Sequence, residues 1–527
     1  MGARTAASWL LVCCASGMLA CTPRPRLDPQ PGIALTAELA AADALVAEGC
    51  YTCLKDALAI YESVAATGRA PAAAFRAIDT ALILAFRERE LGLGGGQALQ
   101  HALELAARQP APFDIAVFRA IADVQAWNAS GVSRERFDES MGPLRQMFKS
   151  WQAWREEILP GASRDRLRAY ALLSLDCSAR GFLGDAGIEA WKPPPGAPPL
   201  LTYRAAVCPP ADGDALGRLV ERDPRFAEAH LFLGELALGR GTLRTAERHL
   251  LAALDAIPEL TAARLTLGHV SLAMEDIDAA LDAYHQVNAA VRGQRDAMLG
   301  EVKSLSYLGR YPDAIAILDD MERLGTWYMG EVYYWRAWNR HRLRQYDAAN
   351  DDVLAARSRL PMDGQVDKLA GFIALARNEV PRAEAEFLAA VGHIEGKGGS
   401  DCEARYYLGS ARVMQRKWAE AAPDFERAEP CYASAQREFA KRIEMIRASD
   451  LQEDRKARLV AAKERDIASA RLQEARSAFN AAVAWANLGD PARALPFAER
   501  AAAHPDLAPQ ATALLERIGK SASVPAS

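Results

Sequence analysis

Small residues recur along the chain at a nearly constant spacing. Gly234 and Gly268 lie 34 positions apart, and the same step joins Ala246 to Ala280 and Ala280 to Ala314. A period of about this length is typical of a unit made of two helices and a turn. Because one such pair cannot bury its apolar face alone, neighbouring pairs must stack. The repeat therefore predicts an array of helices packed on helices.

Six such units span residues 216–430, five of them clear. The degenerate one has Val302 where glycine is common, and the segment GKGGS inserts a loop before the last. Closing prolines such as Pro258 and Pro361 complete the pattern, which resembles the tetratricopeptide repeat (TPR) family. The resemblance implies an all-α fold, a right-handed α-solenoid of antiparallel helix pairs whose first helices line a concave groove.

The regions on either side of the array are less regular. Residues 38–210 are interpreted as degenerate helical repeats that end in the proline-rich loop KPPPGAPP, which is the best internal boundary. Residues 431–527 contain charged helices, a last repeat-like pair and a capping helix at 507–519. The charged helices at 432–470 are either a solvated pair that continues the array or a protruding helix that binds a partner.

The N-terminal sequence is typical of an export signal. Residues 1–20 carry one positive charge and an apolar run too short to span a bilayer comfortably. The run ends in MLAC, which resembles the bacterial lipobox, although Met18 and Leu19 depart from it. The resemblance implies that Cys21 is acylated and that the proline-rich residues 21–37 form a tether. We therefore expect a lipid-anchored protein of the bacterial cell envelope; the alternative is ordinary cleavage to a soluble periplasmic protein. Thr22 replaces the aspartate that retains many lipoproteins in the inner membrane, which favours the outer membrane.

Six cysteines remain beyond the signal and the lipidation residue. An even number in an exported chain indicates disulfides, and six cysteines allow fifteen pairings. Sequence order suggests the pairs Cys50–Cys53, Cys177–Cys208 and Cys402–Cys431. A Cys-X-X-Cys motif before a helix is either a short structural bridge or a redox pair. The absence of a thioredoxin-like strand–helix pattern around Cys50 and Cys53 favours the structural bridge.

The sequence offers no catalytic constellation. It contains no HExxH, no paired CxxC motif, no phosphate-binding glycine loop and no GxSxG elbow. The formal net charge is −5, and there is no basic stripe with interleaved aromatic residues. We therefore expect a protein that is not an enzyme, with no metal, no cofactor and no nucleic-acid partner.

The stretch WYMGEVYYWRAW, residues 327–338, concentrates aromatic residues in one helix. The family pattern places Tyr333 in the core and Tyr334 and Trp338 on the groove; Trp327 and Tyr328 precede the helix. Applied to every unit, the same count assigns eleven side chains to the groove: Glu235, His269, Lys303, Glu331, Tyr334, Trp338, His341, Gln365, Lys368, Phe372 and Tyr406. These rings either bind a partner or fill a tightly coiled solenoid.

Three functions are compatible with this sequence. The first is a lipid-anchored periplasmic scaffold that binds a protein or peptide in its concave groove, in envelope, secretion or pilus-type assembly. The second is an enzyme or small-ligand-binding protein whose site lies in residues 38–210. The third is a thiol-redox protein that uses Cys50 and Cys53. The repeat and the missing catalytic motifs favour the scaffold.

Overall fold

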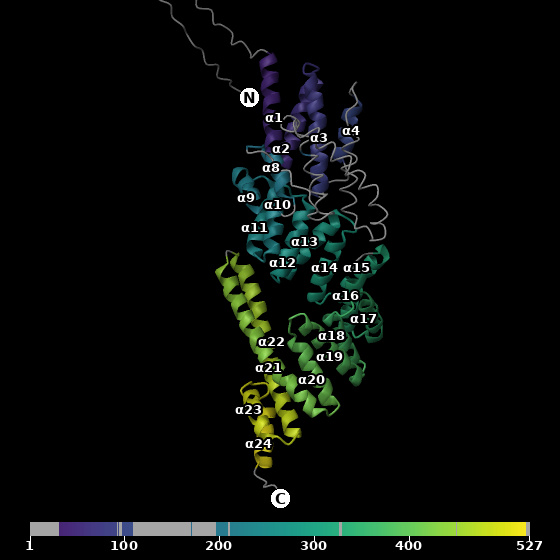
Figure 1. The fold of residues 1–527 in the computed structure, drawn as a ribbon, viewed down its shortest axis with the longest axis vertical. Helices are drawn as coiled ribbons and strands as arrows, with labels where there is room; N and C mark the ends of the chain where they lie inside the picture. The colour runs from purple at the N-terminus through teal and green to yellow at the C-terminus, as the bar shows by residue number, and fades with distance from the viewer. Residues whose placement is uncertain are drawn as a thin grey trace, which may run out of the picture. The chain divides into compact units, whose positions relative to one another are not determined.

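The computed structural model describes residues 31–91, 93, 97–108, 170, 196–208, 211–325, 329–449 and 451–522. Every regular element of these residues is an α-helix (Figure 1). The helices are α1 (Pro31–Glu48), α2 (Tyr51–Ala66), α3 (Pro71–Glu90), α4 (Gln97–Ala107), α8 (Pro199–Ala206), α9 (Gly213–Arg222), α10 (Ala227–Gly239), α11 (Leu243–Ala256), α12 (Thr261–Ala273), α13 (Ile277–Ala290), α14 (Arg295–Tyr307), α15 (Tyr311–Leu324), α16 (Met329–Arg342), α17 (Tyr346–Arg359), α18 (Gly364–Ala376), α19 (Val380–Gly396), α20 (Cys402–Met414), α21 (Trp418–Ala448), α22 (Glu453–Asn487), α23 (Pro491–Ala502) and α24 (Ala508–Ala522).

The chain forms two compact units. The first comprises residues 1–240 and 248–263, and the second comprises residues 241–247 and 264–527. The division therefore falls around α11 and not at the proline-rich loop where we expected the internal boundary. The loop does not separate packing units because α8, which follows it, packs against α1.

The first unit is built on helices that are adjacent in sequence and antiparallel. α1 packs on α2, α2 on α3 and α3 on α4, while α8 packs on α9 and α9 on α10. Cys50, Cys53, Tyr203, Leu216 and Phe226 share one buried apolar cluster. This cluster joins the turn before α2 to α8 and α9, which lie far along the chain.

A close helix–helix approach recurs in three pairs of the second unit, α12–α13, α18–α19 and α20–α21, where an aromatic side chain of the second helix lies against a glycine of the first. A Cβ atom added to Gly371 would lie 2.7 Å from the Phe387 ring, and one added to Gly409 would lie 2.9 Å from Phe425. Both distances are too short for a real Cβ atom, so only glycine permits this approach. Together with the helix pairs α14–α15 through α20–α21, this packing confirms the predicted all-α solenoid.

The last part of the array differs from its predicted form. We expected the second helix of the sixth unit to end before Cys431, but α21 continues through Pro423 and Pro430 to Ala448. α22 packs along α21, and this pairing makes more contacts than any other in the described chain. Tertiary packing therefore overrides the helix-breaking tendency of proline. The predicted charged helices form one long antiparallel helical hairpin. Its second helix, α22, continues into the repeat-like pair that it forms with α23.

Two predictions concern the N-terminal segment. Residues 1–20 and Cys21 lie outside the described residues. Residues 31–37, which we assigned to the tether, instead belong to α1, whose first residue is Pro31. Proline is well tolerated in the first turn of a helix, because the N–H group it lacks there has no partner within the helix. Among the described helices, none is both long enough and apolar enough to cross a bilayer.

Candidate partner-binding wall

The predicted groove residues of the second unit lie on the first helices of successive pairs. They occupy α12, α14, α16, α18 and α20. Most are half-buried, whereas Gln365 is exposed. Glu235 is exposed on α10, which belongs to the first unit. The second unit therefore contains ten of the eleven predicted side chains, including all of the predicted rings.

Aromatic side chains form two groups of ring contacts along these first helices, one on α14 and α16 and one that joins the end of α16 to α18 and α20. Trp335 lies 5.9 Å from Trp338 and 5.5 Å from Tyr334, measured between ring centroids. One turn further along α16, His341 lies 6.3 Å from Phe372. We call the two groups together the aromatic ladder. The first group is Tyr307, Tyr334, Trp335 and Trp338, and the second is His341, Phe372, Tyr407 and Tyr406.

The aromatic ladder combines packing with exposure. Tyr334 and Trp338 are half-buried and pack against two successive apolar clusters, one on each side of α16. Tyr307, at the end of α14, is 57% exposed. One part of these rings therefore fills the solenoid, as the packing alternative predicted, and the rest remains accessible; that the rings bind a partner stays a prediction.

Charged residues between the rings pair with one another across neighbouring first helices. Lys303 lies 3.3 Å from Glu331, and Lys368 lies 2.7 Å from Asp401. Lys368 also lies 3.4 Å from Glu403, and the Gln365 amide donates to Asp401. These pairs link α14 to α16 and α18 to α20. The carboxylates offset the charge of the two lysines. The wall therefore presents aromatic rings with paired charges between them.

Burial shifts the pKa of three rings of the wall in the direction that favours the neutral form. It lowers the pKa of His341, with the Arg342 charge acting in the same direction. It also lowers the pKa of His269, although Asp296 partly opposes this shift. Burial raises the pKa of Tyr334, and nearby Tyr307 and the carboxylates of Asp363 and Asp401 raise it further. Burial of His341, His269 and Tyr334 therefore opposes their charged forms.

The assignment of the stretch at residues 327–338 needs one correction. Tyr333 is half-buried rather than a core residue: its hydroxyl donates to Glu322 at 2.9 Å, and the Arg359 guanidinium lies over its ring. The core position belongs to Trp335, which is 8% exposed. Neither Trp335 nor Tyr407 was assigned from the sequence, although both are adjacent to an assigned ring. Trp327 and Tyr328 lie outside the described residues.

Distant solved structures share the architecture. YrrB, described as a TPR protein with an unusual peptide-binding site, is 16% identical, with a TM-score of 0.30, and the match covers 34% of this chain and 93% of that one. The Cut9–Hcn1 hetero-tetramer of the APC/C matches at 15% identity and a TM-score of 0.39 over 93% of this chain and 96% of that one. A tetratricopeptide repeat protein from Parabacteroides merdae ATCC 43184 matches at 13% identity and a TM-score of 0.35, over 56% and 99% of the two chains.

The array has the tetratricopeptide-repeat fold. The evidence for that fold is the spacing and packing of its own helix pairs. The solved structures match at TM-scores of only 0.30 to 0.39, which is too distant to carry an argument. No protein-family model and no curated protein matches the sequence.

The predicted disulfides are present where the structure describes both cysteines. Cys50 pairs with Cys53, and Cys402 pairs with Cys431. Cys208 is disulfide-bonded, while its predicted partner Cys177 lies outside the described residues. The pair Cys402–Cys431 links the start of α20 to the middle of α21, because α21 continues beyond its predicted end.

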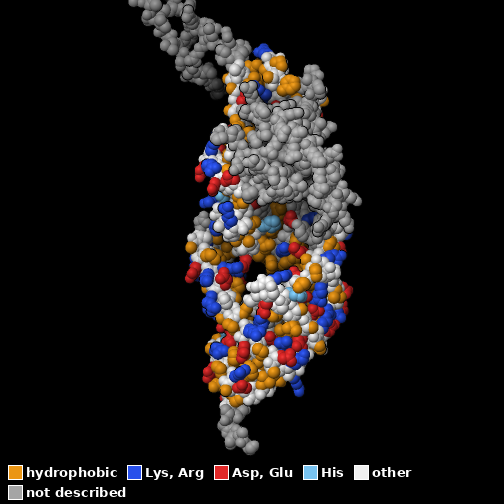
Figure 2. Space-filling view, in the orientation of Figure 1, with side chains coloured by type: hydrophobic (Ala, Val, Ile, Leu, Met, Phe, Trp, Pro, Cys, Tyr) orange, Lys and Arg blue, Asp and Glu red, His pale blue; other side chains and the backbone are white. Residues whose placement is uncertain are grey.

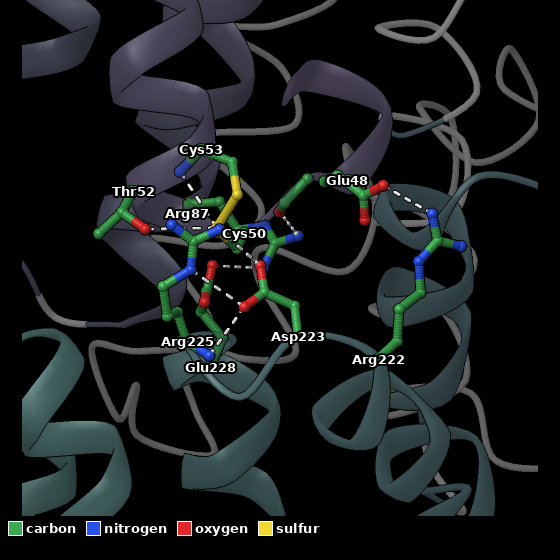
Figure 3. Close-up of a disulfide and its surroundings, with 10 residues drawn as sticks. Glu48, Cys50, Thr52, Cys53, Arg87, Arg222, Asp223, Arg225 and Glu228 are labelled. Carbon is green, nitrogen blue, oxygen red and sulfur yellow. Dashed lines mark hydrogen bonds and ion pairs between the residues drawn. A yellow bond between two sulfur atoms is a disulfide. The ribbon is translucent and has the colours of Figure 1, made fainter. Parts of the chain in front are cut away.

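The Cys50–Cys53 bridge lies at the start of α2 (Figure 3). Cys50 is the N-cap residue, and its sulfur accepts the Cys53 N–H at 3.1 Å. Ligand atoms of Asp223 and both cysteines lie within 4.8 Å of one another, a spacing that would also suit a metal ion. However, the two sulfurs are bonded to each other, and Cys50 and Cys53 are only 0% and 2% exposed. Thiol–disulfide exchange needs an accessible sulfur, so this geometry favours a structural bridge.

A buried ion pair beside this bridge was missed by sequence reasoning. The Arg87 guanidinium donates to Glu228 at 3.0 Å and to the Gly49 carbonyl at 3.0 Å, and both charged side chains are 0% exposed (Figure 3). The guanidinium also lies 3.6 Å from the centroid of the Tyr203 ring. Burial raises the pKa of Glu228, and the Arg87 charge opposes that shift. Arg87 and Glu228 are 141 residues apart, so no local pattern could have joined them.

Proposed function

We propose that the second unit is a scaffold that binds an extended segment of a partner protein along its concave face. The aromatic ladder is the observation that carries this proposal. Partly exposed rings held by a packed core present large contact area with little loss of side-chain freedom on binding, and such rings dominate the energetics of protein interfaces. The neighbouring ion pairs already satisfy the local charges, so the rings supply the main free contact surface.

We further propose that the chain works in the bacterial cell envelope as a lipid-anchored protein, in envelope, secretion or pilus-type assembly. The apolar run, the MLAC sequence and the proline-rich segment after it support this location. Metabolic labelling with a palmitate analogue tests the anchor. Wild-type chain should be labelled and the Cys21→Ser variant should not, and equal labelling of the two would refute acylation at Cys21.

Crosslinked pull-down from envelopes tests the binding function. The test variant is Tyr334→Leu/Trp338→Leu, because leucine retains apolar bulk in the core while removing both rings. The control is Leu354→Ala/Leu388→Ala, which truncates two exposed side chains on the second helices α17 and α19. Each hot-spot ring contributes about 2 kcal/mol or more to binding, so the test variant should lose the partner.

The expected result is capture of one partner by wild type and by the control, with loss in the test variant. All three chains must first show equal helicity and equal melting temperatures. Equal capture by the test variant would assign these rings to packing alone and refute the proposal.

A further inference from the structure

The α21–α22 hairpin extends well past the helix pair that it belongs to. The first half of α21 packs into the array through Ala421, Phe425 and Ala428. Further along α21, the side chain recorded as buried is Ile443. The tip, where the chain turns from Ala448 to Glu453, therefore projects beyond the sixth repeat and needs other contacts to hold it.

Three basic side chains near the tip provide such contacts. Arg455 lies 2.5 Å from Asp276 and 2.5 Å from Glu247. Arg442 and Lys463 both pair with Glu275. The partners are separated by 167 to 208 positions in the sequence, yet all belong to the second unit. The hairpin thus returns from the last repeat to α11 and to the turn between α12 and α13.

The Arg455 pairs are more than incidental surface pairs, whereas the Arg442–Glu275 pair is exposed. Glu247 and Asp276 are each 5% exposed, and Lys463 is 4% exposed. Burial disfavours the charged form of Arg455, but hydrogen bonds and charge interactions with Glu247 and Asp276 hold its pKa above the ordinary value. A partly buried pair is screened by salt much less than an exposed one, so this set can hold the hairpin in place.

These ion pairs join the two ends of a series of packed helices within the second unit. The series of packed helices runs from α13 through α14, α15, α16 and so on to α20, α21 and α22, and the ion pairs then join α22 to the turn before α13. The space-filling view shows an opening in the face that is turned toward the viewer (Figure 2). The first-helix wall with the aromatic ladder belongs to this same series of helices.

We propose that the α21–α22 hairpin is a releasable strap that closes the second unit into a ring. The contacts described above are between charged groups, so the strap opens when its charges are lost and closes again when they are restored. Closure itself is independent of any partner. Its consequence, that large molecules reach the aromatic ladder only after the strap opens, rests on the proposed binding function.

Distance measurements test closure directly. Spin labels are attached to Ala273→Cys on α12 and Ala457→Cys on α22, two exposed positions, in a full chain whose Cys13, Cys14 and Cys21 are replaced by serine. The released form is Arg442→Glu/Arg455→Glu/Lys463→Glu. The matched control is Arg458→Glu, since Arg458 lies on the same helix but pairs with Asp454 on its own helix.

The wild type and the control should give one short, narrow distance distribution, and the released form a longer and broader one. Adding Glu247→Arg/Glu275→Arg/Asp276→Arg to the released form should restore the short distance. The proposed strap would be refuted if the released form kept the short distance, or if the wild type gave a broad distance distribution.

Labelling rates test separately whether the closed strap keeps large molecules from the aromatic ladder. A cysteine at Glu331→Cys, on the wall, is treated with a small maleimide and with a maleimide on a long polyethylene glycol chain. Release of the strap should speed the polymer reaction several-fold and leave the small-reagent rate unchanged. If the distances show release but the polymer rate does not rise, gating is refuted. Partner capture is measured independently, so a failed gate and a failed binding function remain distinguishable.

Discussion

The two units hold themselves together in different ways. In the first, one buried guanidinium, Arg87, connects α3 to Glu228 on α10, to the carbonyl of Gly49 and to the ring of Tyr203. In the second, the same small contact between a glycine and an aromatic ring recurs in three helix pairs, α12–α13, α18–α19 and α20–α21. A concentrated polar core depends on one residue, whereas a repeat array spreads its stability over neighbours. Substitutions should therefore act globally in the first unit and locally in the second.

The largest effect is expected from Arg87→Met. It leaves Glu228 buried without its cation, which costs about 3–5 kcal/mol. Chemical unfolding of the full chain should show the first unit unfolding at lower denaturant. The double variant Arg87→Met/Glu228→Gln should recover part of that loss, because no charge is then stranded. A single variant as stable as wild type would contradict the concentrated core.

The next effect concerns the disulfide of the array. Cys402 and Cys431 are separated by 29 residues, and closing such a loop stabilises the fold by about 3–4 kcal/mol in the chain-entropy model. Cys402→Ser/Cys431→Ser should lower the free energy of unfolding of the second unit by that amount, seen as a lower unfolding midpoint. The Cys50–Cys53 bridge spans 3 residues and should contribute only about 1.5 kcal/mol. An unfolding midpoint of the Cys402→Ser/Cys431→Ser variant equal to that of the oxidised wild type would show that the Cys402–Cys431 disulfide does not stabilise the second unit.

A smaller, local effect is expected from Gly371→Ala. The added methyl group meets Phe387 at 2.7 Å, and such overpacking costs about 1–3 kcal/mol. Gly392→Ala is the matched control, since a Cβ there meets nothing within 4 Å and alanine favours the helix by about 1 kcal/mol. Thermal melting should move in opposite directions for the two variants. A shift in the same direction would refute the steric role of Gly371.

The smallest effect is a pH dependence at Asp401. Burial would raise the pKa of this carboxyl, but Lys368 and the Ala404 N–H lower it below its ordinary value of 3.8. A lowered folded-state pKa gives stability that is present above the ordinary pKa and is lost as pH falls through the folded-state pKa. Asp401→Asn keeps a side-chain oxygen for the helix cap but removes the charge. The stability gap between wild type and variant should therefore shrink in acid, and a constant gap from pH 7 to pH 3 would contradict this.

The sequence predicted what is local or periodic. The spacing of Gly268, Ala280 and their repeats was enough to place the helix pairs, and sequence order was enough to pair Cys402 with Cys431. The register of α16 placed Tyr334 and Trp338 on one face, because residues four apart on a helix share a face. It failed for Tyr333, since a hydrogen bond to Glu322 on α15 and a cation–π contact with Arg359 on α17 draw the side chain to the edge of the core.

Contacts between distant segments lay beyond the sequence. Arg455 and Glu247 are 208 residues apart, and nothing in either neighbourhood marks them as partners. The same holds for Arg87 and Glu228. Such pairs follow from how the helices stack in three dimensions, which periodicity does not encode. They are also the contacts that make each unit more than a plain repeat.

The most direct test of the account is site-specific photo-crosslinking in envelopes. A photoreactive amino acid is placed at Phe372, Tyr406 or Glu331 on the first helices, and at Leu354 or Leu388 on the second helices. The account predicts that one partner crosslinks from the first-helix positions and not from the second-helix positions. Crosslinks from the second helices alone, or equally from both sets, would contradict a binding wall on the first helices.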